Sequence, residues 1–151
     1  MSIFNTQLDP DCVSWFDQFT TIHMNDFLTM KFDGDNIVPD FCPMSGNSSK
    51  DPRFQDKEHP EFENMVSHLL EEGGGYAFYI FQYDDENGDR CEKLVFYTYV
   101  DENSPEETKT KIAFGRIVVE RGCPGPWIQI QANCKEDLSY KFGLDIVLKN
   151  P

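Results

Sequence analysis

The stretch that decides the fold runs from Gly75 to Ile112 and reads GYAFYIFQYDDENGDRCEKLVFYTYVDENSPEETKTKI. Its first part, Tyr76–Tyr83, is nearly all apolar, which is typical of a central strand that is covered on both faces. The polar segment that follows contains Asn87-Gly88, a dipeptide that favours a tight hairpin turn. A second apolar run, 93–100, comes next. The stretch therefore predicts two adjacent strands that lead into a helix.

This helix is predicted to begin at Ser104. Ser104 as N-cap, Pro105 at the first helical position and Glu107 at the third form a capping box. Glu107 and Lys111 are spaced (i, i+4) in the favourable order. Lys109 and Lys111 would place two positive charges on the first turns, so the helix is the candidate working surface of the molecule.

The second half of the helix carries an apolar set. Ile112, Ala113 and Ile117 are expected to face the core, and Arg116 adds to the basic patch. Gly115 has a low helix propensity and predicts a break there. The segment 122–126, which reads GCPGP, ends the helix.

The flanking segments complete the fold. A first helix is predicted over Asp9–Phe19 with Asp9 as N-cap, and a strand over Phe27–Phe32 turns at Asp33-Gly34 into a return strand that begins at Ile37. The proline-rich segment at about 39–60 is predicted to be a long surface loop.

The C-terminal elements show equally clear patterns. A helix over Glu61–Glu72 has an apolar stripe, a strand over Trp127–Gln131 alternates strictly, and a last helix over Glu136–Leu148 would dock through Leu138, Phe142 and Ile146. The order α-β-β-α-β-β-α-β-α predicts an α/β (α+β) fold, in which a central mixed sheet of about five strands has helices on both faces. We expect a single domain over residues 1–151.

Composition limits the classes of function. The chain has 151 residues and a formal net charge of −14, which disfavours nucleic acid and anionic membranes as partners. No apolar run is long enough to span a membrane. The N-terminal residues lack a secretory signal pattern, and the five cysteines include no Cys-x-x-Cys pair. These features predict a cytoplasmic, monomeric protein with reduced thiols.

No pattern indicates catalysis. The three histidines lack zinc-ligand spacing, and a calcium loop centred on Gly88 would need oxygen ligands where Tyr83 and Leu94 stand. We therefore expect no metal, no cofactor and no enzyme. The alternative is a small hydrolase that uses Cys91 or a pair of carboxylates, although Cys91 has no recognisable base.

Several segments together resemble the actin-depolymerising-factor homology domain, the fold of cofilin and its relatives. Gly88–Phe96 reads GDRCEKLVF and is similar to the cofilin stretch GRKCSKLVF, and Thr108–Ile112 reads TKTKI and is similar to IKSKM at the start of the family's actin-binding helix. Residues 75–81, 128–132 and 9–19 look like the preceding strand, the last strand and the first helix of the family. The resemblance covers most of the chain.

The resemblance implies an actin-binding protein that regulates filament dynamics by binding monomers, filaments or both. The helix that starts at Ser104 would enter the cleft between two actin subdomains. The residues implied for actin contact are Ser104, Lys109, Lys111, Ile112 and Arg116. Arg90 and Lys93 fall on a second, filament-side surface, and Ser2 stands where cofilins carry a regulatory phosphoserine.

Two other family members remain as alternatives. Residues 29–34 (TMKFDG) and 37–39 (IVP) resemble coactosin, which binds the sides of filaments. Asp89 and Glu92 replace a basic and a neutral residue of the filament-side stretch, which favours a protein similar to glia maturation factor. Such a protein would bind the actin-related branching complex. All three readings place the protein in the cytoplasm, on the cytoskeleton.

Overall fold

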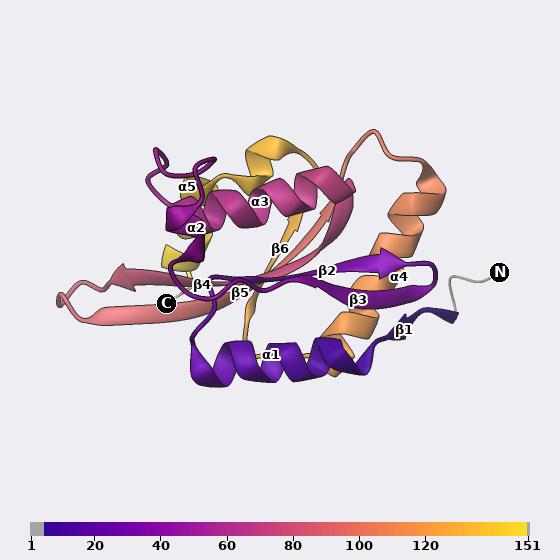
Figure 1. The fold of residues 1–151 in the computed structure, drawn as a ribbon, viewed down its shortest axis with the longest axis horizontal. Helices are drawn as coiled ribbons and strands as arrows, with labels where there is room; N and C mark the ends of the chain where they lie inside the picture. The colour runs from indigo at the N-terminus through magenta and orange to yellow at the C-terminus, as the bar shows by residue number, and fades with distance from the viewer. Residues whose placement is uncertain (1–4, 151) are drawn as a thin grey trace.

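The computed structural model describes residues 5–150, and its framework is one mixed sheet (Figure 1). The strands are β1 (Gln7–Leu8), β2 (Leu28–Asp33), β3 (Asn36–Phe41), β4 (Gly74–Asp84), β5 (Arg90–Val100) and β6 (Ile128–Ala132). They lie in the order β1-β3-β2-β4-β5-β6. The pairs β1–β3 and β5–β6 are parallel and the other pairs are antiparallel.

The mixed fold is confirmed, but the sheet has six strands where about five were predicted. The additional strand is β1, which pairs with β3 through the register Gln7↔Asn36 and Leu8↔Ile37. Two residues carry too little pattern to be recognised as a strand. They are held in place because Asp9 N–H donates to the Ile37 carbonyl at 2.8 Å.

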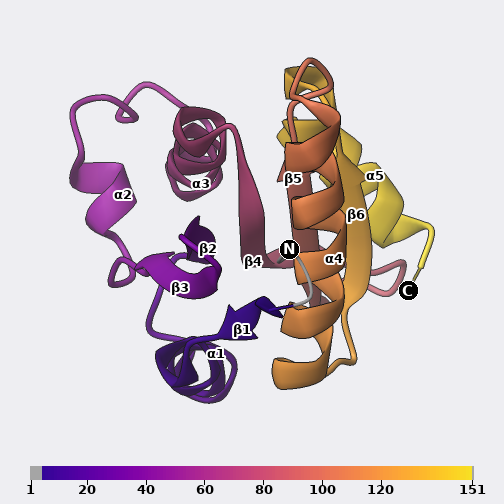
Figure 2. The same ribbon diagram turned by 90° about the vertical axis from the view of Figure 1, so that its right-hand side faces the viewer.

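The helices cover both faces of this sheet (Figure 2). They are α1 (Pro10–Ile22), α2 (Asn47–Lys50), α3 (Pro60–Glu72), α4 (Glu106–Gly122) and α5 (Tyr140–Leu148), with a 3-10 turn η2 (Lys135–Leu138) before α5. Side chains of α1 and α4 pack on one face, in a cluster that includes Phe16, Ile112 and Val119. Side chains of α3 and α5 pack on the other, with Phe62 and Val147.

The central hairpin formed by β4 and β5 separates the two clusters. It pairs continuously from Gly74↔Val100 to Asp84↔Arg90, and Gly88 takes φ +80° in the turn. Successive residues of β4 face opposite clusters, with Phe78 in one and Tyr79 in the other. This explains why both strands are apolar without alternation. The prediction of a central hairpin is confirmed.

Short-range signals set several helix ends. Asp9 caps α1 as predicted, and its Oδ1 accepts a hydrogen bond from Asp11 N–H at 2.8 Å. Gly73 ends α3 in the left-handed conformation, with φ +73°. The segment at about 39–60 contains the end of β3, which extends to Phe41, and the short helix α2. Its Phe54 side chain is buried.

The predicted last helix, 136–148, is wrong in one respect. The chain forms η2 and then α5, because Ser139 adopts an extended conformation and its Oγ accepts a hydrogen bond from Phe142 N–H at 3.1 Å. A serine that caps a helix begins a new one and cannot continue the old. Leu138 is buried as predicted, but Phe142 is 41% exposed and does not dock the helix.

Candidate functional site

Helix α4 is the longest helix among the described residues and stands at one end of the sheet (Figures 1 and 2). It begins one residue later than predicted, since Pro105 is the N-cap and no side chain caps the helix. Ser104 N–H donates instead to the Asp101 carbonyl at 3.0 Å, within the turn that precedes the helix. The predicted capping box of Ser104 and Glu107 is therefore wrong.

The helix also runs without a break through Gly115, contrary to the prediction. Gly115 is buried and lies against Tyr76, whose hydroxyl donates to the Ile112 carbonyl at 2.6 Å. The missing Cβ lets the helix approach the sheet closely at this point. Packing against Tyr76 and Phe32 thus outweighs the low helix propensity of one glycine.

The two lysines of the basic patch lie on different sides of α4. Residues two positions apart on a helix point about 200° away from each other. Lys111 Nζ donates to the Gly34 carbonyl at 2.7 Å and lies 4.6 Å from the centre of the Phe32 ring. Lys109 Nζ lies 3.8 Å from a carboxylate oxygen of Glu106. Lys111 therefore ties α4 to the turn between β2 and β3, whereas Lys109, with 34% of its side chain exposed, pairs within the first turn of the helix.

Arg116 is held by groups of its own surroundings. Its Nη1 lies 2.6 Å from Glu120 Oε1 and 3.1 Å from Gln129 Oε1, and Gln129 Nε2 in turn contacts the same Glu120 oxygen. This network joins α4 to β6 and neutralises the Arg116 charge. Ile112 is 5% exposed, so it supports the helix from inside.

The centre of the outer face of α4 carries uncharged side chains. Ile112, Gly115 and Val119 face the sheet, and the exposed stripe opposite contains Thr110, Ala113, Ile117 and Arg121. The prediction that Ala113 and Ile117 face the core is wrong. The spacing of residues 112, 115 and 119 would have given the correct face, had Gly115 been counted as part of it.

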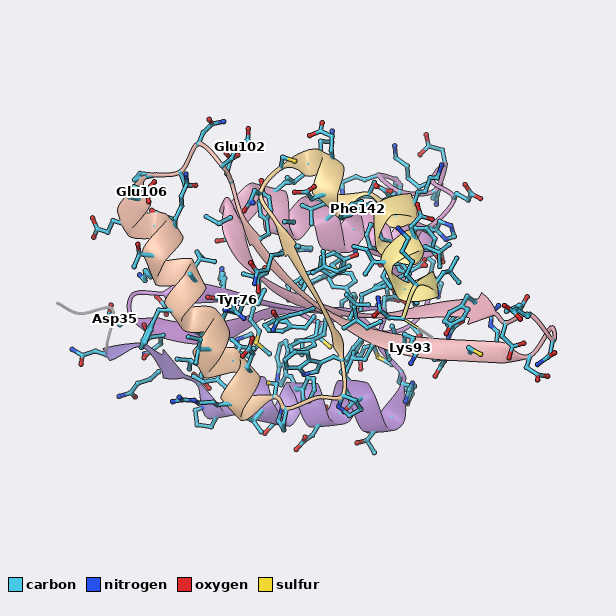
Figure 3. All side chains as sticks on the ribbon, turned by 180° about the vertical axis from the view of Figure 1, so that it is seen from behind. Asp35, Tyr76, Lys93, Glu102, Glu106 and Phe142 are labelled. Atoms are coloured by element: carbon cyan, nitrogen blue, oxygen red, sulfur yellow. The ribbon has the colours of Figure 1, made fainter. Side chains whose placement is uncertain are left out.

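Arg90 and Lys93 lie on the β4–β5 hairpin, away from α4. Figure 3 shows Lys93 on the opposite side of the molecule from Glu106 and Asp35. Arg90 is exposed and lies 3.5 Å from Asp84, and it donates to Gln82 Oε1 at 3.0 Å. Ser2, the candidate phosphorylation site, lies outside the described residues.

Cys91, the candidate nucleophile of the alternative hydrolase, shows no sign of activation. Desolvation, followed by the Asp85 carboxylate, raises the pKa of the Cys91 thiol, whereas a nucleophilic cysteine needs a lowered pKa. Within residues 5–150 no three His, Cys, Asp or Glu side chains gather closely enough to bind a metal ion. None of the helices there combines the length and apolar character that a membrane span requires.

Comparison with protein families gives a match over almost the whole chain. Residues 5–147 match the family described as cofilin/tropomyosin-type actin-binding protein. The chain belongs to this family. The match confirms the resemblance inferred from the sequence, and membership supports a general role in actin binding. No curated protein sequence matches the chain.

Solved structures share the fold of this cofilin-family chain at low sequence identity. Streptomyces griseoflavus cofilin is 16% identical with a TM-score of 0.77, and the match covers 95% of this chain and 98% of that one. The ADF-like UNC-60A protein of Caenorhabditis elegans is 15% identical with a TM-score of 0.77, over 96% and 95% of the two chains. Human coactosin-like protein is 17% identical with a TM-score of 0.74, over 97% and 99%.

Proposed function

We propose that this protein binds actin through the outer face of α4, and that α4 enters the cleft between two actin subdomains as the family resemblance implies. By binding one subunit conformation more tightly than another, the protein would shift the turnover of filaments. The observation that carries the proposal is a rigid, uninterrupted helix whose exposed stripe has a small, apolar centre at Ala113 and Ile117.

Rigidity supports the proposal because a preformed helix loses little entropy on binding. Tyr76 and Lys111 hydrogen-bond α4 to the rest of the fold, one at the Ile112 carbonyl and one at the Gly34 carbonyl. Arg116 adds the contact with Gln129 of β6. Among the residues expected at the actin interface, Lys109 and Ser104 are therefore proposed as contacts. Lys111, Ile112 and Arg116 are proposed to act by fixing the helix.

The exposed apolar stripe is the proposed source of affinity. Ile117 is 38% exposed and lies beside Ala113 on the outer face of α4. With a net charge of −14, the protein has no overall attraction to an acidic partner such as actin. The local contact of Ile117 and its neighbours is therefore the proposed source of most of the binding free energy, with Arg121 on the same stripe and Lys109 at the helix start as the cations.

The test is binding of actin monomers by titration and of filaments by co-sedimentation. Ile117→Asp is expected to weaken binding by about tenfold or more, as at anchor residues that become buried in an interface. Ile22→Asp is the matched control, because Ile22 is also an exposed isoleucine (53%, against 38% for Ile117) at the end of α1, away from α4. Equal affinities for the two variants would refute the placement of the site, and no binding of either form of actin would refute the function.

The filament-side surface favours a second candidate. The β4–β5 hairpin is acidic, and Arg90 is already paired with Asp84. This supports weak binding along filament sides and leaves monomers or the actin-related branching complex as alternative targets. A coactosin-like side binder would co-sediment with filaments without dismantling them. A regulator similar to glia maturation factor would remove branches without binding monomers. In each case we propose a monomeric, cytoplasmic protein at the cytoskeleton.

A further inference from the structure

The end of β4 has an unpaired edge. Pairing of β4 with β2 stops at Leu28↔Phe78, whereas pairing with β5 continues to Asp84↔Arg90. The last six residues of β4, Tyr79–Asp84, therefore have a neighbouring strand on one side only within residues 5–150. The arms of this hairpin extend past the rest of the sheet in Figure 1. An edge of this kind presents unpaired N–H and C=O groups to any extended chain beside it.

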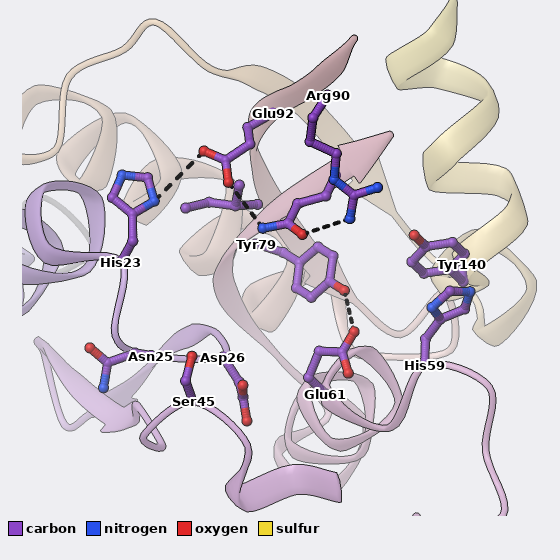
Figure 4. A pocket seen from close by; sticks show the side chains of 12 residues that line it. His23, Asn25, Asp26, Ser45, His59, Glu61, Tyr79, Arg90, Glu92 and Tyr140 are labelled. Carbon is purple, nitrogen blue, oxygen red and sulfur yellow. Dashed lines mark hydrogen bonds and ion pairs between the residues drawn. The ribbon is translucent and has the colours of Figure 1, made fainter. Parts of the chain in front are cut away.

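A cavity of about 430 Å³ runs along this edge (Figure 4). Its wall includes Tyr79, which packs with α3 and α5, and Ile80, which packs with α1 on the opposite face of the sheet. A cavity that is lined from both faces of a strand must lie along the edge of that strand. A smaller cavity of about 210 Å³ shares His23, Ile80 and Glu92 with it and continues beside the hairpin.

The lining of the larger cavity is negatively charged. Its carboxylates are Asp26, Glu61 and Glu92, against one guanidinium, Arg90. Glu61 Oε1 accepts a hydrogen bond from Tyr79, and Glu92 Oε2 accepts one from Gln82. These bonds fix two of the carboxylates beside the strand. The charge favours a cationic partner and disfavours an acidic one.

An aromatic pair forms the far wall. The rings of His59 and Tyr140 stack with centroids 3.5 Å apart and an interplanar angle of 12°. They come from the start of α3 and the start of α5, and Figure 4 shows them on the side of the cavity away from His23. Aromatic faces accept the alkyl part and the charge of a basic side chain.

We propose that Tyr79–Asp84 binds an extended, basic segment of a partner protein as an additional strand of the sheet. The backbone of the segment would pair with the unpaired edge of β4, and its Lys or Arg side chains would meet the cavity carboxylates. A second copy of this chain is a poor occupant, because two chains of net charge −14 repel each other. This site is separate from α4 and does not depend on the function proposed for α4.

The test uses the full chain and a synthetic peptide, Thr-Lys-Val-Arg-Thr-Lys-Val-Arg. Two comparison peptides carry Glu in place of Lys and Arg, or N-methyl groups on alternate backbone nitrogens. The basic peptide is expected to bind and to slow amide hydrogen exchange within residues 79–84. The acidic and N-methylated peptides should bind at least about tenfold more weakly, because one loses charge pairing and the other loses strand pairing.

A conservative variant locates the site. Glu61→Gln keeps an acceptor for the Tyr79 hydroxyl. It is expected to lower the affinity for the basic peptide by about threefold to tenfold at low salt. Glu107→Gln on α4 makes the same change in net charge and is expected to have no effect.

Three results would overturn the proposal. The first is no binding of the basic peptide up to about 1 mM. The second is an affinity for the acidic or N-methylated peptide equal to that for the basic peptide, or slowed amide hydrogen exchange that lies outside β4. The third is a concentration-dependent dimer that protects the same amides without peptide, which would assign the edge to self-association.

Discussion

Gly115→Ala is expected to destabilise this protein, although glycine to alanine normally stabilises a helix. A Cβ at residue 115 would overlap the Tyr76 hydroxyl and lie 2.8 Å from Phe32 Cζ. The Tyr76 ring is fully buried and the Phe32 ring is partly buried against the same cluster, and the Tyr76 hydroxyl donates a hydrogen bond to the Ile112 carbonyl at 2.6 Å. The added methyl group must therefore displace Tyr76, α4 or both.

The magnitude follows from three contributions. The helix propensity of alanine contributes up to about 1 kcal/mol in favour of the variant. Overpacking costs about 1–3 kcal/mol, and loss of the buried Tyr76 hydrogen bond costs about 1–3 kcal/mol more. The net loss in the free energy of unfolding is therefore about 1–5 kcal/mol, which corresponds to a fall in Tm of roughly 2–20 °C in a domain of this length.

Urea unfolding followed by circular dichroism measures this change. Ala113→Gly is the matched control on the exposed face of the same helix, and it should cost about 1 kcal/mol from propensity alone. In the double variant with Tyr76→Phe, the hydroxyl that overlaps the new methyl is absent. The loss in the free energy of unfolding of the double variant should therefore be smaller than the sum of the two single losses by about 1 kcal/mol.

Two results would refute this reasoning. A Gly115→Ala variant that is more stable than the parent would show that α4 moves away from the sheet at little cost. A double variant whose loss equals the sum of the single losses would show that Tyr76 is not the group that opposes the methyl.

Three further predictions concern other parts of the molecule. Asp9→Ala should lower the free energy of unfolding by about 1 kcal/mol, because Asp11 N–H loses its acceptor; an unchanged urea midpoint would contradict this. Burial raises the pKa of Cys12 from 9.0 to about 12, so the folded state keeps a proton that the unfolded state loses above pH 9. The free energy of unfolding should therefore fall as the pH rises from 9 towards 12, by up to about 1.4 kcal/mol per pH unit for this thiol. The fall should be less steep in Cys12→Ala. Equal slopes of free energy against pH in the two proteins would show that the Cys12 thiol is not the cause. Lys109→Ala should weaken actin binding about threefold at low salt and little at high salt, and a loss independent of salt would point to packing instead of charge.

The sequence by itself determined the elements that depend on near neighbours. The apolar runs of β4 and β5, the Asn87-Gly88 turn, the Asp9 cap and the apolar stripe of α3 were all readable, because each arises within a few residues of chain. The order of these elements, with the motifs at 88–96 and 108–112, was sufficient to indicate the family.

Only the tertiary structure decided which side of α4 is exposed and what holds the helix in place. Lys111 bonds to Gly34, 77 residues away, and Gly115 permits a close approach to Tyr76 that no local pattern reveals. These contacts tie Lys111 to the turn between β2 and β3 and leave Ile117 on the outer face of α4. The unpaired edge of β4 has the same origin, since it depends on where β2 stops. Sequence patterns report the preferences of neighbouring residues, whereas these features depend on which distant segments the fold brings together.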